Sequence, residues 1–264
     1  MSALALGLRD SWTLAGRNLR RGYAVPAQFV PALAFPVVFT LLYGYVFGSG
    51  MTVPGGGDYI AFLMPGLFVQ MTAFGLVGTM SEVAGDAAKG ITDRFRSLPI
   101  AAAAVVGGRS VSDMANAVLG LAVMVAMGLL MGWSWTRGAA DAAAAIGLLL
   151  LLRFALLWIG IYLGLLARDP EAVSGLFLLT FPVTMVTSAF VAPELMPGWL
   201  GTIAEWNPLS ATIGATRELF GNPGAATGGG WPAQHAQLLA VLWPLVLVAV
   251  FLPLAARRYR AMSR

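Results

Sequence analysis

Few residues in this sequence could do chemistry, and their types narrow the choice at once. The 264-residue chain has no Cys and a single His, His235, so it can build neither a disulfide framework nor a Cys-based or His-rich metal site. Its only Lys, Lys89, precedes Gly90 in an acidic, Ala-rich context, so the phosphate-binding pattern G-x-x-x-x-G-K-[ST] is absent. We therefore expect this chain to bind no metal, cofactor or nucleotide by itself.

The composition is that of a membrane protein. Hydrophobic residues make up 58% of the chain and charged residues only 11%, with a mean hydropathy of +0.79, whereas soluble domains are about 25% charged. The formal net charge of +4 is small and its residues are scattered, so we expect no nucleic-acid partner.

Six apolar stretches are long enough to cross a bilayer, which takes about 20 mostly apolar residues. The predicted spans are Gln28–Phe47, Tyr59–Met80, Val111–Trp133, Ala142–Ala167, Glu171–Ala192 and Leu238–Ala256. The fold class that they predict is all-α and polytopic. Its domains are an N-terminal arm, residues 1–24, and a transmembrane domain, residues 25–264.

Basic residues predict the orientation of these spans, because Lys and Arg accumulate in cytoplasmic segments. The segments that would share one side carry Arg9, Arg17, Arg20, Arg21, Lys89, Arg94, Arg96, Arg109, Arg168, Arg257, Arg258, Arg260 and Arg264. The opposite side carries only Arg137 and Arg217. Both termini are therefore predicted to be cytoplasmic, in the inner or plasma membrane.

Small residues recur at four-residue spacing in several spans. Gly44/Gly48, Gly128/Gly132 and Gly160/Gly164 follow this pattern, which lets helices approach closely. We expect it to serve packing within one chain, with a subunit interface as the alternative.

The N-terminal arm has a helical period of its own. Trp12 belongs to an apolar stripe, while Arg17 and Arg20 belong to a second, basic stripe that Arg21 extends. An amphipathic helix of this kind lies flat on the membrane surface. The alternative is a basic arm that only holds the N-terminus inside.

The segment 82–109 mixes acids and bases more than a simple turn requires. Its charged residues include Glu82, Asp86, Lys89, Asp93, Arg94 and Arg96. A short helix ending before Pro99 would fit, because proline disfavours helical geometry in the residue before it. Such a helix could dock on a soluble partner; the alternative is a solvated loop that serves topology alone.

Between the fifth and sixth spans, Asn207-Pro208 predicts a helix start, with Asn as N-cap and Pro in the first turn, and the helix should run through Phe220. Trp206, Arg217 and Glu218 belong to the same external segment. Ile203, Trp206, Leu209, Ile213 and Phe220 would let it enter the outer leaflet. The alternative is an ordinary packed loop.

Arg153 interrupts the apolar run of the fourth span. A charge at that depth is costly, so such residues usually face a cavity or a partner. We expect no acid at matching depth in the other spans, and the hypothesis is that Arg153 borders the translocation route or a subunit interface. The alternative is that it reaches the membrane surface or donates to backbone carbonyls freed by a kink. Asp169-Pro170 predicts the start of the fifth span.

Three stretches together resemble a known family. They are GITDRFRSLPIAAAAVVGGRSVSD, the upstream MPGLFVQMTAFG and the downstream NPLSATIGATRELFG. The sequence resembles the ABC-2 type permeases, in particular the actinobacterial permeases similar to those of daunorubicin/doxorubicin-resistance exporters, over nearly its whole length.

The resemblance implies a mechanism and partners. It implies that the segment after the second span forms a coupling helix on a separate ABC ATPase, that the N-terminal arm is an interfacial helix, and that short re-entrant helices lie between spans five and six. ATP and Mg²⁺ would be bound by that ATPase, and the permease would pair with a second copy or a related permease. Cargo would be a hydrophobic drug, antibiotic, or lipid-like or glycolipid compound.

Two other classes remain as alternatives. An ion-coupled secondary carrier would place ionisable residues near the midplane and show repeated halves, but the sequence shows only Arg153 at depth and no clear repeat. An intramembrane enzyme lacks an obvious nucleophile or base here. We predict a transport subunit that is not itself an enzyme.

Overall fold

The computed structural model describes residues 26–47, 53, 56–89, 102–167, 170–225 and 229–261, and every regular element in them is helical. The long elements are α2 (Pro26–Leu41), which continues as the π-helix η1 (Leu42–Phe47), α3 (Tyr59–Ala88), α5 (Ala102–Leu130), α6 (Ala139–Ala167), α7 (Pro170–Met185) and α11 (Ala236–Ala261). The short elements are η2 (Pro193–Leu195), α8 (Gly198–Trp206), α9 (Pro208–Phe220) and α10 (Trp231–Gln234).

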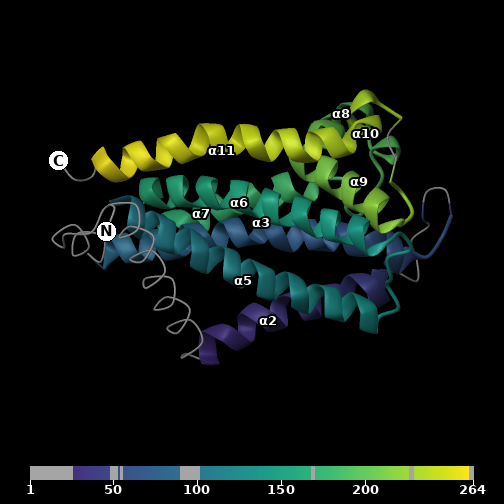
Figure 1. Cartoon of the computed structure of the whole chain (residues 1–264), viewed down its shortest axis with the longest axis horizontal. Helices are drawn as coiled ribbons and strands as arrows, with labels where there is room; N and C mark the ends of the chain where they lie inside the picture. Colours follow the sequence, from purple (N-terminus) through teal and green to yellow (C-terminus); the bar gives the residue numbers. More distant parts are fainter. Residues whose placement is uncertain are drawn as a thin grey trace.

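The long helices lie side by side along the long axis of the molecule, with α2 oblique to them (Figure 1). The short helices α8, α9 and α10 gather at one end, which we call the α9 end. The carboxyl end of α11 lies at the opposite end. The predicted external segment and the C-terminal tail are therefore at opposite ends of the bundle.

Four helices are long and apolar enough to cross a membrane, namely those over Tyr59–Ala88, Gly107–Leu130, Ala139–Ala167 and Ala236–Tyr259. The other two predicted spans correspond to shorter apolar helices over Ala34–Val46 and Glu171–Met185. At 1.5 Å per residue, the 16 residues of α7 reach about 24 Å, less than the roughly 30 Å hydrocarbon core. The part of the chain described here therefore supports four spans by length, and the count of six stays a prediction.

Three helices have ends that differ from those of the predicted spans. The second span continues as one helix to Ala88 instead of ending at Met80, and the third begins at Ala102 instead of Val111. The described parts of the segment 82–109 are thus the ends of two long helices, and Arg109 of α5 pairs there with Glu82 and Asp86 of α3. The fifth span ends at Met185 rather than Ala192, since a side chain caps its last carbonyls.

Glycines bring α3 and α6 into close contact. A Cβ at Gly160 would lie 3.0 Å from the carbonyl oxygen of Leu76, and one at Gly164 would lie 2.8 Å from that of Met80. Both contacts are within the chain, which confirms the predicted role of the Gly160/Gly164 pair in intrachain packing. The α3 backbone lies so close that the face of α6 toward it has no room for a side chain at these two positions.

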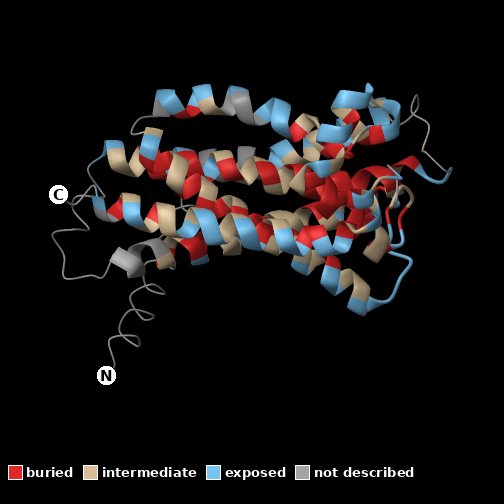
Figure 2. Ribbon diagram, turned by 90° about the horizontal axis from the view of Figure 1, so that it is seen from above, coloured by how far each residue is buried: buried red, intermediate tan, exposed pale blue. Residues whose placement is uncertain are grey.

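The largest hydrophobic core lies toward the α9 end (Figure 2). It combines the first half of α3, including Phe62 and Phe68, with Trp133 and with Leu209, Ile213 and Phe220 of α9. The expectation that those three α9 residues face the outer leaflet was therefore wrong. They lie on the face of α9 that the long helices cover, whereas Ile203 and Trp206 of α8 are exposed.

Candidate functional site

The predicted ATPase contact is described in part. Glu82 and Asp86 lie on the last turns of α3, and Lys89 is its C-cap. Arg109 of α5 joins both acids, with Nη2 2.8 Å from Glu82 Oε2 and Nη1 2.7 Å from Asp86 Oδ2. Glu82 remains 64% exposed in this pairing, so one acid of the group still faces outward at the end where α3 stops.

The remaining residues of that prediction lie outside the described residues. They are Asp93, Arg94 and Arg96 of the segment after α3. The residues of the predicted interfacial helix, Trp12, Arg17, Arg20 and Arg21, also lie outside the described residues. Their roles stay predictions. Pro170 is the first residue of α7, as predicted, while Asp169 is not described.

Arg153 has an acidic neighbour, which corrects the expectation that none lies at its depth. Its Nη2 is 3.7 Å from Asp113 Oδ2 on α5, and the two side chains are only 9% and 7% exposed. The same Nη2 donates a 2.9 Å hydrogen bond to Thr79 Oγ1 on α3, and the Thr79 hydroxyl donates a 2.8 Å hydrogen bond to Asp113 Oδ2. Asp113 belongs to the predicted third span, Val111–Trp133, but was not recognised as an acid at the depth of Arg153.

Asn207 caps two helices at once. Its Oδ1 accepts from the backbone N–H of Leu209, as the predicted N-cap of α9, whose first residue is Pro208. Its Nδ2 donates to the carbonyl oxygens of Val183 (3.1 Å) and Val186 (2.9 Å). These are carbonyls that the end of α7 would otherwise leave without a partner. One side chain therefore fixes where α7 stops and where α9 begins.

Arg217 is the best-anchored charge of the external segment, a role that its predicted place there did not indicate. Its side chain is 0% exposed and its guanidinium donates to three carbonyl oxygens, those of Phe62, Ser188 and Ala189. The Phe62 ring centroid lies 3.8 Å from its Cζ. Burial lowers the pKa of Arg217 to about 9, so it remains a cation at neutral pH. Its neighbour Glu218 is half-buried.

A signal for this burial exists in the sequence. Arg217 follows Ile213 by four residues and precedes Phe220 by three, so all three share one face of α9. An arginine in an apolar stripe of a short helix indicates that the guanidinium has partners in the core.

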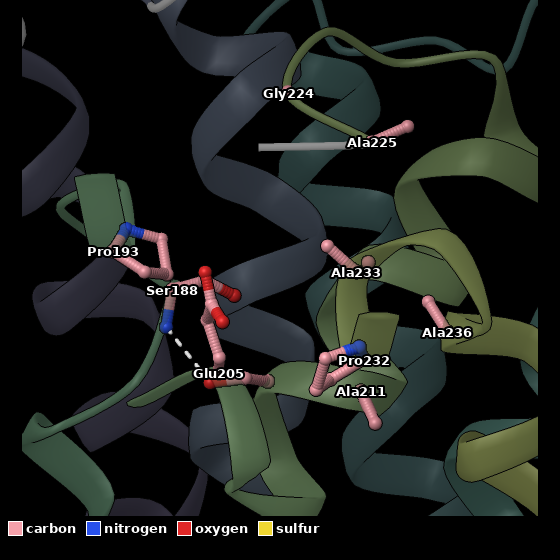
Figure 3. A pocket seen from close by; sticks show the side chains of 11 residues that line it. Ser188, Pro193, Glu205, Ala211, Gly224, Ala225, Pro232, Ala233 and Ala236 are labelled. Carbon is pink, nitrogen blue, oxygen red and sulfur yellow. Dashed lines mark hydrogen bonds between the residues drawn. The ribbon is translucent and has the colours of Figure 1, made fainter. Parts of the chain in front are cut away.

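A small pocket opens at the α9 end (Figure 3). Its lining includes Glu205 of α8, Pro193 of η2, Ser210 of α9 and Ser188, whose backbone N–H donates to Ser210 Oγ. The space measures about 20 Å³, room for one water molecule. A pocket of this size holds no drug-sized cargo.

Among the residues described, no group of three or more His, Cys, Asp or Glu could hold a metal ion. The ionisable groups that the structure brings together are instead an alternating series of acids and bases along α3, α5 and α6. This arrangement can hold helices in register.

The chain belongs to the ABC-2 type transporter family, whose sequence profile matches residues 9–220. It is 35% identical over 236 residues to the "Daunorubicin resistance ABC transporter permease protein DrrB1" of Streptomyces coeruleorubidus. That similarity covers 89% of this chain and 80% of the relative. The predicted family resemblance is confirmed, and the chain is a multi-pass membrane protein of a transporter family whose permeases in general work with an ABC ATPase.

Proposed function

We propose that this chain is the membrane-spanning permease subunit of an ATP-driven exporter. The similarity to a drug-resistance ABC permease over most of both chains is the observation that carries this proposal. The permease forms the path with a second copy of itself or a related permease, and a separate ABC ATPase binds ATP and Mg²⁺. Closure of the ATPase on ATP moves the cytoplasmic ends of the helices and changes which side of the membrane the path faces.

The proposed cargo is a hydrophobic drug, antibiotic, or lipid-like or glycolipid compound. An aromatic strip formed by Phe35 and Phe39 of α2, Phe74 of α3 and Phe181 of α7 supports it. The rings of Phe35 and Phe74 lie 5.9 Å apart edge-on, and those of Phe74 and Phe181 lie 6.4 Å apart and nearly parallel. Phe35 is 53% exposed. Spaced aromatic faces of this kind suit flat hydrophobic molecules.

The proposed orientation places the α9 end outside and both termini in the cytoplasm. Because the chain has no Cys, single cysteines report sidedness without background. Ser134→Cys and Thr202→Cys, both at exposed positions, are expected to react with a membrane-impermeant maleimide on intact cells. Lys89→Cys and Arg257→Cys, also exposed, should react only after permeabilisation. Labelling of all four on intact cells would contradict the orientation.

ATP-driven transport is tested directly in inside-out membrane vesicles that contain the chain and its ABC ATPase. With daunorubicin as the probe, we expect uptake on addition of ATP that persists when ionophores dissipate ion gradients. Vesicles with a hydrolysis-deficient ATPase serve as the control. Asp113 and Arg153 are ionisable groups at depth, which a secondary carrier would also use. Uptake that follows an ion gradient without ATP would therefore replace this proposal with the carrier.

In the same vesicles, Asp93→Ala and Arg94→Ala are each expected to lower daunorubicin-stimulated ATP hydrolysis by about fivefold or more. A factor of about five is the lower end of the usual range for coupling between two sites. The reason is that both residues are predicted to lie at the contact with the ATPase. Arg137→Ala, an exposed arginine in the connection between α5 and α6, is the matched control. Unchanged stimulation and unchanged copurification of the ATPase in both variants would show that the contact lies elsewhere.

A further inference from the structure

Three polar side chains from three different helices meet inside the bundle. Thr79 of α3, Asp113 of α5 and Arg153 of α6 are all buried, and the Thr79 hydroxyl bonds both of the charged groups. Arg153 Nη1 is buried without a hydrogen-bond partner. The contact is therefore a buried ion pair bridged by a hydroxyl and not fully satisfied, which is a costly arrangement for a membrane protein.

This contact continues toward the end of α3 as a charged seam. Arg109 precedes Asp113 by one turn on α5, and Glu82 and Asp86 follow Thr79 on the same face of α3. The carboxylate of Glu82 also lies within electrostatic reach of Asp113 and Arg153. Acids and bases thus follow one another along the α3–α5 boundary down to the end of the bundle where α3 stops.

Packing alone holds α5 weakly. In its membrane-length stretch 17% of the residues are buried, against 61% for α3. The α3–α6 contact, in contrast, is held by glycines and apolar side chains. Polar contacts therefore contribute to the position of α5 against the α3–α6 pair.

The two ends of the seam respond differently to a slide of α5 along α3. Glu82 and Asp86 are one helical turn apart, so Arg109 retains a carboxylate partner when α5 shifts by as much as a turn. Asp113 has no second basic partner at its own depth among the described residues, so the same slide separates it from Arg153. The pairing of Arg109 with Glu82 and Asp86 therefore tolerates the movement. The buried pair of Asp113 and Arg153 forms or breaks with it.

We propose that Thr79, Asp113 and Arg153 are positioning residues for transport, which link movement of the cytoplasmic ends of α3 and α5 to α6 in the interior of the bundle. This inference rests on the proposed function, because it assigns the movement to the ATPase cycle. It differs from the hypothesis that Arg153 borders the translocation route or a subunit interface, because the Arg153 side chain is buried against α3 and α5.

The decisive variant removes both charges together. Asp113→Leu or Arg153→Leu alone leaves one buried charge unpaired and is expected to lower the thermal midpoint of the purified chain. The double variant Asp113→Leu/Arg153→Leu should recover the midpoint, because apolar side chains can replace a buried ion pair. In daunorubicin uptake assays with the ATPase, it should nevertheless transport about tenfold less per ATP hydrolysed. Arg153→Lys, which keeps the charge, should retain more transport than Arg153→Leu.

A second pair of variants tests the contact without removing a charge. A Cβ at Gly75 would lie 2.9 Å from Arg153 Cζ, while one at Gly78 on the same helix would meet nothing within 4 Å. Gly75→Ala should displace the guanidinium and lower transport per ATP by about fivefold, and Gly78→Ala should match the unsubstituted chain. This comparison decides the matter if the double variant does not fold.

The outcomes distinguish failure of the positioning role from failure of the proposed exporter function. Full transport per ATP in the double variant, or equal behaviour of Gly75→Ala and Gly78→Ala, would overturn the positioning role and leave the exporter standing. Absence of ATP-driven uptake in the unsubstituted chain with its ATPase would instead overturn the proposed function itself.

Discussion

Replacing Arg217 with Met is expected to destabilise the folded chain more than any other single substitution in α9. The guanidinium donates to carbonyl oxygens of α3 and of the turn after α7, and Met fills similar space but donates nothing. Orphaned buried acceptors cost about 1–3 kcal/mol each, so a loss of roughly 3 kcal/mol or more is expected even though removal of a buried charge offsets part of it.

Thermal unfolding of the purified chain in lipid nanodiscs measures this effect. A loss of that size corresponds to a fall of about 6–12 °C in the midpoint for a chain of this length class. Arg137→Met is the matched control, because Arg137 is exposed in the connection between α5 and α6. Arg217→Lys should fall between, since one ammonium cannot reach all of the carbonyls in the same geometry. A midpoint equal to that of Arg137→Met would show that the carbonyls find other donors.

Gly164→Val is expected to separate α3 from α6. Its Cβ would lie 2.7 Å from Val83 Cβ and 2.8 Å from the carbonyl oxygen of Met80. A backbone oxygen cannot rotate away as a side chain can, so the helices must move apart and the close packing along them is lost. Overpacking of this kind costs about 1–3 kcal/mol or more.

Gly147→Val on the same helix is the matched control, because a Cβ there would meet nothing within 4 Å. It should leave the thermal midpoint and the yield of monodisperse protein unchanged, while Gly164→Val lowers both. Similar values for the two variants would mean that the α3–α6 contact yields without cost. That result would also remove the reason for treating these two helices as a fixed pair.

The sequence predicted the helices well and their ends less well. Long apolar runs determine where α6 and α11 lie, because a single segment satisfies its own backbone hydrogen bonds in a bilayer only as a helix. The start of α5 was missed because Gly107-Gly108 and the nearby charges are typical of a loop. Arg109 is nevertheless helical, and it pairs with acids on the neighbouring helix α3. A local pattern carries no information about such partners.

The same limit applies to the candidate site. Arg153 was identified from its depth in an apolar run, but its partner depends on the register between α5 and α6, which no local spacing encodes. The cap by Asn207 was predicted for α9 from the Asn-Pro pair. Its second role at the end of α7 required the two helices to be placed together in space.

The hydrophobic core is distributed unevenly along the bundle, and this distribution affects how α5 can move. Met124 of α5 packs into the largest core at the α9 end, so under the proposed mechanism α5 would pivot there against the α3–α6 pair, and its opposite end would move furthest. In α5, Asp113 lies about 26 Å and Arg109 about 32 Å from Leu130, at 1.5 Å per residue. A tilt of α5 by roughly 10° would then move these residues by about 4.5 Å and 5.5 Å. Such a tilt would therefore move Asp113 by more than the 3.7 Å that separates its carboxylate from the Arg153 guanidinium.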